Sequence, residues 1–198
     1  MSTLYYIAIF VAILFVVKQI SESEIFNLKC IISNVDGEQY CVRDKKDKER
    51  SADLLAHVNV RCKKIVDYLH ETYPGDERVV RLKNGFNPQK INEILPTSKL
   101  TAYSENKGEK IAFCLNKTAP PVKSDTELID INTLTFVAYH ELTHIMSKTY
   151  GHNDEFWENF KFILEKAKES GIYSSVDYKK TPQKYCGMTI SDNPYYDL

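Results

Sequence analysis

The sequence predicts an α+β fold in which packing helices and a small antiparallel sheet form one domain. The chain has 198 residues, of which 43% are hydrophobic and 27% charged, as is typical of one globular domain. Helical spacing of apolar residues over 51–72 and a segment without glycine or proline over 132–149 predict two long helices. Two runs of strand composition between them predict a hairpin. The predicted organisation is a hydrophobic anchor helix at 1–20, a charged linker at 21–50 and the domain itself at 51–198.

The amino-terminal segment predicts a membrane anchor. Residues 4–17 read LYYIAIFVAILFVV, without a charge, and Lys18 follows where its side chain could reach the headgroups. A membrane span needs about 20 residues, which the flanking residues supply. The alternatives are a signal peptide, which would want a basic region ahead of the apolar run, and a buried core helix. Positive charge is more frequent after the segment than before it, which places the domain on the cytosolic side.

Cysteine usage and net charge restrict the environment and the partners. The five cysteines are widely spaced and form no C-x-x-C motif, which agrees with reduced thiols in a cytosol-facing domain. In a lumenal domain Cys30 and Cys41 could instead form a disulfide, and Asn116-Lys117-Thr118 would be a glycosylation sequon. The formal net charge of −1, with no series of basic and aromatic residues, predicts no nucleic-acid partner.

The first long helix follows a run of alternating charges at 43–50, RDKKDKER, which is expected to be solvated. Ser51 is a plausible N-cap, and the helix should continue to Thr72. His57 and His70 lie within it and are expected at its surface. One apolar stripe should face the core, formed by Leu54, Val58, Cys62, Ile65 and Leu69.

Shorter elements are expected between the two long helices. A strand at 79–82 and a helix from 87 or 88 to 95, stopped by Pro96, precede the hairpin. The hairpin joins strands at 99–104 and 110–115 through a turn at 106–108.

The second long helix carries an H-E-x-x-H motif. His140 and His144 are four residues apart and therefore share one helix face, from which both imidazoles can reach one metal ion. Glu141 lies next to them and could act as general base on a water held by that ion. Two histidines and a carboxylate in this pattern are the ligands and base of a zinc metallopeptidase. Asp130 and Asn132 are N-cap candidates, and Gly151 follows the helix.

The third metal ligand has two candidates. Gly151 allows the chain to reverse, which could bring His152 back over the histidine pair, ahead of a helix from Asp154 to Ser170. The alternative is a carboxylate from that helix, Glu155 or Glu158. A catalytic site keeps three protein ligands and an open position, whereas a structural zinc site would require a fourth protein ligand.

These motifs resemble a known family. Gly151-His152-Asn153-Asp154-Glu155-Phe156-Trp157, after the H-E-L-T-H helix, resembles the G-H-x-x-x-F element of the WLM and SprT-like zincin metallopeptidases. The stretch Thr101 to Ile111 resembles the strand hairpin of WLM-type domains. The resemblance covers about residues 77–190 and is close to membrane-anchored WLM-like proteins of large DNA viruses and some microbial eukaryotes. It implies a zincin-like fold, one catalytic zinc ion bound by His140, His144 and His152, Glu141 as the base, and a protein or peptide substrate.

The resemblance also suggests how substrate would be held. In zincins the strand nearest the active helix binds extended substrate along its free edge, and residues 110–115 would be that strand; otherwise the hairpin only covers the core. Tyr185 is a candidate donor to the oxyanion, Met188 a candidate floor under the metal, and Phe156 and Trp157 are expected core anchors.

The alternative function is a membrane-tethered binding or assembly protein with a zinc site that does not cut.

Overall fold

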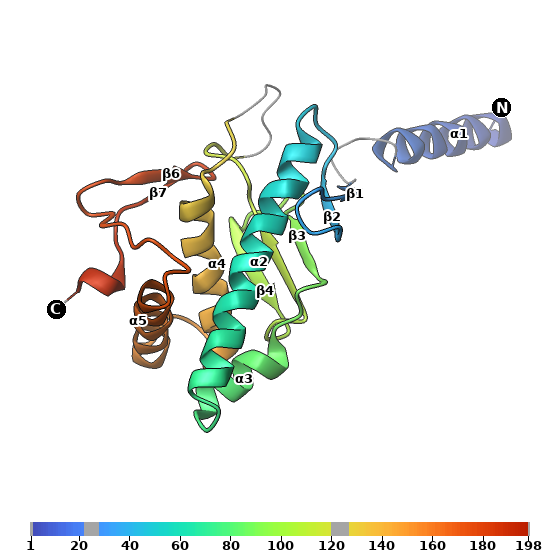
Figure 1. The fold of residues 1–198 in the computed structure, drawn as a ribbon. Coiled ribbons are helices and arrows are strands. Elements are labelled where there is room, and N and C mark those ends of the chain that lie inside the picture. The colour runs from blue at the N-terminus through green and yellow to red at the C-terminus, as the bar shows by residue number, and fades with distance from the viewer. Residues whose placement is uncertain (1, 22–27, 120–126, 198) are drawn as a thin grey trace.

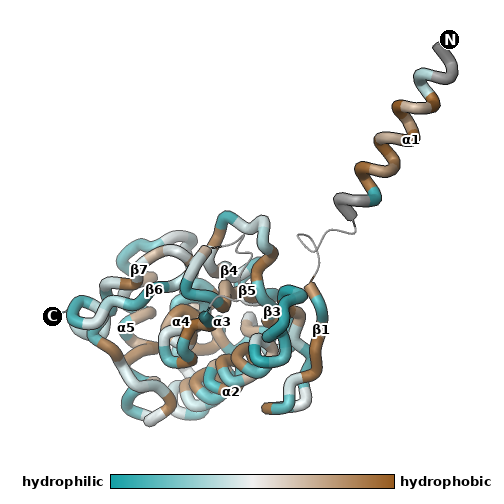
Figure 2. The backbone as a smooth tube through the Cα atoms, turned by 90° about the horizontal axis from the view of Figure 1, so that it is seen from above, coloured by the Kyte–Doolittle hydropathy of each residue, from teal (hydrophilic) through white to brown (hydrophobic). Residues whose placement is uncertain are grey.

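The computed structural model describes residues 2–21, 28–119 and 127–197. Helix α1 (Ser2–Ser21) lies apart from the rest of the chain in both views (Figures 1 and 2), and its side chains from 5 to 18 are exposed. In the part of the chain that the structure describes, no helix has both the length and the apolarity needed to cross a membrane. The residues predicted as an anchor are thus helical, but the predicted membrane span is not supported.

A five-stranded sheet forms one layer of the domain, in the order β1-β2-β3-β5-β4. The sheet is mixed: β1–β2 and β4–β5 pair antiparallel, whereas β3 pairs parallel with both β2 and β5. The prediction of an antiparallel sheet was therefore wrong for its centre. The predicted linker at 21–50 contributes two of the five strands. The strands are β1 (Leu28–Ile32), β2 (Gln39–Arg43), β3 (Ile91–Glu93), β4 (Ala102–Glu105) and β5 (Lys110–Phe113).

Helices α2 (Lys48–Thr72) and α4 (Ile131–Met146) pack against the sheet, α2 on β2 and β3 and α4 on β4. Helix α5 (Asp154–Glu169) packs on α4 (Figure 1). The apolar stripe predicted for α2 is confirmed: four of its members are buried and Leu54 is partly buried against the core. His57 and His70 are exposed, as expected.

Two short elements differ from the prediction. Residues 79–82 lie in helix α3 (Glu77–Gly85), which Asp76 caps by accepting a hydrogen bond from the Arg78 amide. Val79 and Leu82 are three apart and both buried, so the apolar pair reflects a helix face rather than a strand. Residues 87–95 were expected to be helical, but they contain β3, because the backbone of 91–93 pairs with β5 in the sheet.

The β4–β5 hairpin turn lies against the end of α3. Gly108 has φ +104°, and a Cβ there would collide with the Gly85 carbonyl and with Ile145 of α4. Glycine is therefore required at this approach. The turn is fixed beside the carboxyl-terminal half of α4, where His144 lies.

Two disulfides connect four of the five cysteines. Cys30–Cys41 joins directly opposed residues of β1 and β2, and Cys114–Cys186 joins the end of β5 to the carboxyl-terminal segment. The prediction of reduced thiols was therefore wrong for all but Cys62, which is buried and whose thiol pKa burial raises to about 12. The sequon is not available in the folded chain, because Asn116 is buried and its side-chain oxygen accepts a hydrogen bond from Lys45.

Removing the two disulfides should have unequal effects on stability. Cys114–Cys186 closes a loop of 72 residues and Cys30–Cys41 one of 11. Loop-closure entropy then assigns about 4 kcal/mol to the first and about 3 kcal/mol to the second. We expect Cys114→Ala/Cys186→Ala to lower the free energy of unfolding more than Cys30→Ala/Cys41→Ala, as measured by urea denaturation. Equal losses would contradict the loop-length argument, and peptide mapping without reductant checks both pairings.

The candidate metal centre and its cleft

Helix α4 positions the two motif histidines. Its amino terminus is capped by Asp130, whose carboxylate accepts a hydrogen bond from the Thr133 amide at 2.9 Å. The helix ends at Met146 rather than at 149, so the reversal toward α5 begins earlier than the sequence suggests. Gly151, with φ +85°, lies inside that turn and not at the helix end.

The three predicted histidines converge. The ring nitrogens that His140, His144 and His152 can offer lie within 4.8 Å of one another, and the Nε2 atoms of His140 and His152 are 2.9 Å apart. In the part of the chain that the structure describes, this group contains no fourth His, Cys, Asp or Glu. The geometry matches a site with three protein ligands and an open position, and not the closed site of a structural zinc.

The donor set fits a metal ion by two further criteria. A tetrahedral ion with bonds of about 2.1 Å separates its ligand atoms by roughly 3.4 Å, which lies between the 2.9 Å pair and the 4.8 Å limit of the group. Burial lowers the pKa of His140 to about 3 and that of His144 to about 4. Both imidazoles are therefore neutral near pH 7, which is the form that binds a metal. The three residues could hold zinc.

Phe156 of α5 contacts all three imidazoles. Its ring centroid lies 4.8 Å from that of His140, 4.5 Å from His144 and 4.6 Å from His152, and its side chain is fully buried. Trp157 is instead 44% exposed and donates its indole N–H to the His152 carbonyl. Phe156 is thus the core anchor that the sequence suggested, whereas Trp157 holds the backbone of the turn.

The two alternative ligands, the carboxylates of Glu155 and Glu158, lie outside the histidine group. Glu155 accepts hydrogen bonds from the Lys148 and Thr149 amides and from the Thr149 hydroxyl. These bonds, that of the Thr149 hydroxyl foremost, hold the pKa of Glu155 at about 2. Glu158 is exposed on α5 and lies outside the histidine group. Glu155 therefore shapes the turn before His152, and the geometry favours His152 as third ligand.

Sequence reasoning missed Lys107. Its ammonium group donates to the carbonyls of His144, Ser147 and Thr149, at 2.8–3.0 Å. These acceptors lie at the end of α4 and in the turn that carries His152, so one side chain connects the second histidine to the third. Cations at helix carboxyl ends satisfy carbonyls that lack partners within the helix. The turn sequence Asn106-Lys107-Gly108 identified a hairpin but gave no sign of this role.

We expect Lys107→Met to weaken zinc binding. The change leaves three carbonyls without their donor and loosens the turn before His152, and losing an outer contact of a metal site typically costs 10- to 100-fold in affinity. Competition with a chromophoric chelator measures the dissociation constant. Lys110→Met is the matched control, because Lys110 is in the same hairpin. Its ammonium group makes a long ion pair, 4.0 Å from the Glu105 carboxylate. An unchanged zinc affinity in Lys107→Met would exclude this role.

Glu141 lies beside the histidines and is 5% exposed. Burial raises the pKa of its carboxyl to about 8, and a hydrogen bond with the Ser104 backbone opposes that shift. In the antiparallel β4–β5 pair Thr101 faces Cys114 through a backbone hydrogen bond, so the alternate residues Ala102 and Ser104 direct their backbone groups away from β5. The outer edge of β4 therefore faces Glu141.

One cleft of about 740 Å³ contains the histidine group, Glu141 and β4. The strand at this edge is β4 and not the predicted 110–115, because β5 is flanked by β3 and β4 and has no free edge. The cleft is also lined by the carboxyl-terminal hairpin, β6 (Gln183–Tyr185) and β7 (Met188–Ile190), which precedes a short 3-10 helix, η1 (Pro194–Tyr196).

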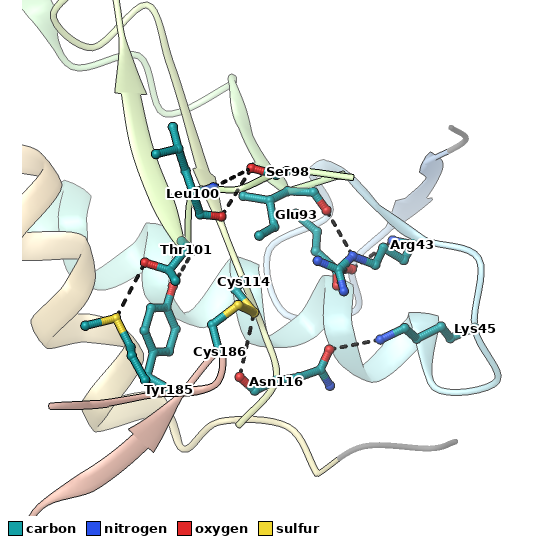
Figure 3. The surroundings of a disulfide bond; sticks show 12 residues. Arg43, Lys45, Glu93, Ser98, Leu100, Thr101, Cys114, Asn116, Tyr185 and Cys186 are labelled. Carbon is teal, nitrogen blue, oxygen red and sulfur yellow. Dashed lines mark hydrogen bonds and ion pairs between the residues drawn. A yellow bond between two sulfur atoms is a disulfide. The ribbon is translucent and has the colours of Figure 1, made fainter. Parts of the chain in front are cut away.

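Tyr185 and Met188 line the cleft with their polar atoms already engaged. The Tyr185 hydroxyl donates to the Thr101 carbonyl at 2.9 Å, and the Met188 sulfur accepts from the Thr101 hydroxyl at 3.8 Å (Figure 3). The Tyr185 proton is therefore not available to an oxyanion in this arrangement. The contacts hold the hairpin to the start of β4 beside the Cys114–Cys186 disulfide (Figure 3).

The fold and the site together define a mixed α+β domain with a cleft whose three histidines could bind a metal ion. No protein-family model matches the chain. It is 27% identical to uncharacterized protein R325 of Acanthamoeba polyphaga mimivirus, over 92% of this chain and 91% of the relative. It is 22% identical to uncharacterized protein 136R of Invertebrate iridescent virus 6, over 88% and 91%. Similar proteins thus occur in viruses, as the resemblance implied.

Among solved structures, the crystal structure of Wss1 from Saccharomyces cerevisiae is similar to this chain. The two have a TM-score of 0.46 and 19% sequence identity, over 71% of this chain and 99% of that chain.

Proposed function

We propose that this chain is a zinc-dependent peptidase of the H-E-x-x-H type, with His140, His144 and His152 as zinc ligands and Glu141 as general base. The observation that carries the proposal is the convergence of three imidazoles beside the buried carboxyl group of Glu141 in one cleft. A binding protein needs no carboxylate at this position, which favours the enzyme over a catalytically silent form.

When bound, zinc would act as a Lewis acid that activates water near neutral pH and polarises a carbonyl. Glu141 supplies the proton transfers: in its ionised form it accepts a proton as water attacks the peptide carbonyl, and it then delivers that proton to the leaving amine. The burial of Glu141 restricts its access to bulk solvent, and the contact with the Ser104 backbone orients its carboxylate.

The outer edge of β4 would hold the substrate. Backbone groups of Ala102 face the cleft, and an extended peptide could add to this edge by main-chain hydrogen bonds. The edge passes Glu141 at Ser104, so a strand bound along it would lie beside the histidine group. β-Augmentation at β4 would thus bring a substrate peptide bond to Glu141 and the histidine group through main-chain hydrogen bonds.

Metal removal tests the proposal. The chain with its disulfides intact should contain one zinc ion by mass spectrometry of the native protein, and should cut an unfolded protein substrate. Chelation followed by dialysis should abolish the cleavage, and one equivalent of zinc should restore it. Cleavage that persists after the metal has been removed would refute a zinc peptidase.

The proposal also includes a membrane location for this chain. The exposed side chains of α1 from Tyr5 to Val17 are almost all large and apolar, and such a surface calls for an apolar environment. We retain the tether to a membrane on this ground. The two disulfides favour an oxidising compartment for the domain, opposite to the expected cytosolic side. Flotation with lipid vesicles, compared with a chain that begins at residue 22, tests the tether.

A further inference from the structure

The cleft has two distinguishable ends. Strand β4 and helix α4 run in the same direction along it, because Ser104 lies beside Glu141 and Lys107 binds the His144 carbonyl. The start of β4 therefore lies beside the turn of α4 before His140, where Val137 lines the cleft. The carboxyl-terminal hairpin closes this end through the Tyr185–Thr101 hydrogen bond and the disulfide (Figure 3).

The side chains that meet at this end are apolar, and we name them the apolar subsite. Leu100 and Met188 are 57% and 48% exposed, although they are large hydrophobic residues. Tyr185 lines the same end of the cleft, but its side chain is buried and its hydroxyl is bound to the backbone. The apolar subsite consists of Leu100, Ala102, Val137, Tyr185, Met188 and Ile190.

Two of the charged side chains that line the cleft, those of Lys107 and Asp192, already have partners within the chain. Of the described residues that line the cleft, Lys107, Glu141 and Asp192 carry acidic or basic side chains in addition to the three histidines. Lys107 is bound to three carbonyls and stacks on the Tyr150 ring at 4.4 Å, and Asp192 pairs with Lys179 at 3.2 Å. A charged substrate side chain in the apolar subsite would lose its hydration, and no side chain of the subsite carries a charge to replace it, which is unfavourable.

We infer that the cleft selects substrates with a large apolar side chain, such as Leu, Met or Phe, bound in the apolar subsite. This inference rests on the proposed function, because it assigns the substrate class of the same cleft. The selected side chain lies on the side of the histidine group that faces the amino-terminal end of α4. Apolar contact with exposed Leu100 and Met188 gives the gain in affinity, since burial removes the apolar surface of both partners from water.

Peptide binding by the zinc-loaded Glu141→Gln chain tests the inference without cleavage. The peptides are fluorescent glycine-serine sequences that differ at one residue, so a difference in affinity reports how that one side chain binds in the apolar subsite. We expect the Leu and Phe peptides to bind about tenfold tighter than the Lys and Glu peptides, the scale of discrimination that apolar pockets achieve. Met188→Glu should reduce binding of the Leu peptide by a similar factor and improve that of the Lys peptide.

The matched control is Ile32→Glu, because Ile32 is 67% exposed on β1 and is not among the residues that line the cleft. It should leave all four affinities unchanged. Equal binding of the Leu, Lys and Glu peptides, or an unaltered preference in both Met188→Glu and Leu100→Glu, would overturn the apolar subsite. Cleavage by the native chain is measured separately. A preference for apolar peptides without cleavage would refute only the proposed peptidase. Cleavage without that preference would refute only the apolar subsite.

Discussion

Replacing Glu141 with glutamine should abolish peptide cleavage while leaving zinc bound. Glutamine has nearly the same shape and can still occupy the site beside the Ser104 backbone, but its amide cannot accept a proton from water. General-base catalysis by a positioned side chain contributes about 10²- to 10⁴-fold, so the turnover number should fall by at least about 100-fold. Zinc content by mass spectrometry and turnover of a fluorogenic peptide are measured on the same preparation.

The matched control is Glu109→Gln, which removes an exposed carboxylate from the β4–β5 turn. It should retain both zinc and activity. Loss of zinc in Glu141→Gln would show that Glu141 supports the metal rather than the chemistry. Equal, negligible turnover in the native and Glu141→Gln chains, with zinc present in both, would favour the silent binding protein instead.

The site could be predicted largely from local spacing. His140 and His144 share a face because a helix returns to the same direction after four residues, and this geometry does not depend on the remaining fold. The position of His152 required only a reversal after α4. Lys107, by contrast, acts through three carbonyls that lie 37 to 42 residues along the chain, and no local pattern encodes such a pairing.

The fold was less predictable where pairing across the sheet decides the outcome. Residues 28–43 carry strands that a charged neighbourhood at 43–50 concealed, and 91–93 become a strand only because β2 and β5 flank them. The order of the strands made β4 the free edge, although 110–115 has the more apolar composition. The more apolar strand is the inner one: β3 and β4 pair with both of its edges, and Ile111, Ala112 and Phe113 are all buried.

The cysteines illustrate the same limit. Cys30 and Cys41 are 11 residues apart, and their pairing was one alternative, tied to a lumenal domain. Cys114 and Cys186 are 72 residues apart, and only the packing of the carboxyl-terminal hairpin against β4 brings them together. The odd number of cysteines suggested reduced thiols, whereas the fold leaves the fifth one, Cys62, buried in the core.

Substitutions at His152 and Glu155 should show which of the two side chains is the third zinc ligand. We expect His152→Ala to lower zinc affinity by more than about 100-fold, beyond the loss typical of outer contacts, because one of three ligand nitrogens is removed. Glu155→Gln should lower the affinity by about tenfold or less, since it weakens hydrogen bonds to the Lys148 and Thr149 amides but leaves every imidazole in place. Chelator competition at constant pH measures both values.

Glu158→Gln is the control for this comparison, because Glu158 is an exposed carboxylate on the same helix and contacts none of the three imidazoles in the histidine group. It should bind zinc as the native chain does. Cobalt substitution adds an independent measurement: the visible absorption of the bound ion should change in His152→Ala and persist in Glu155→Gln. If Glu155→Gln instead lost the metal and altered the cobalt spectrum while His152→Ala retained both, the carboxylate would be the third ligand and the turn would have to rearrange when zinc binds.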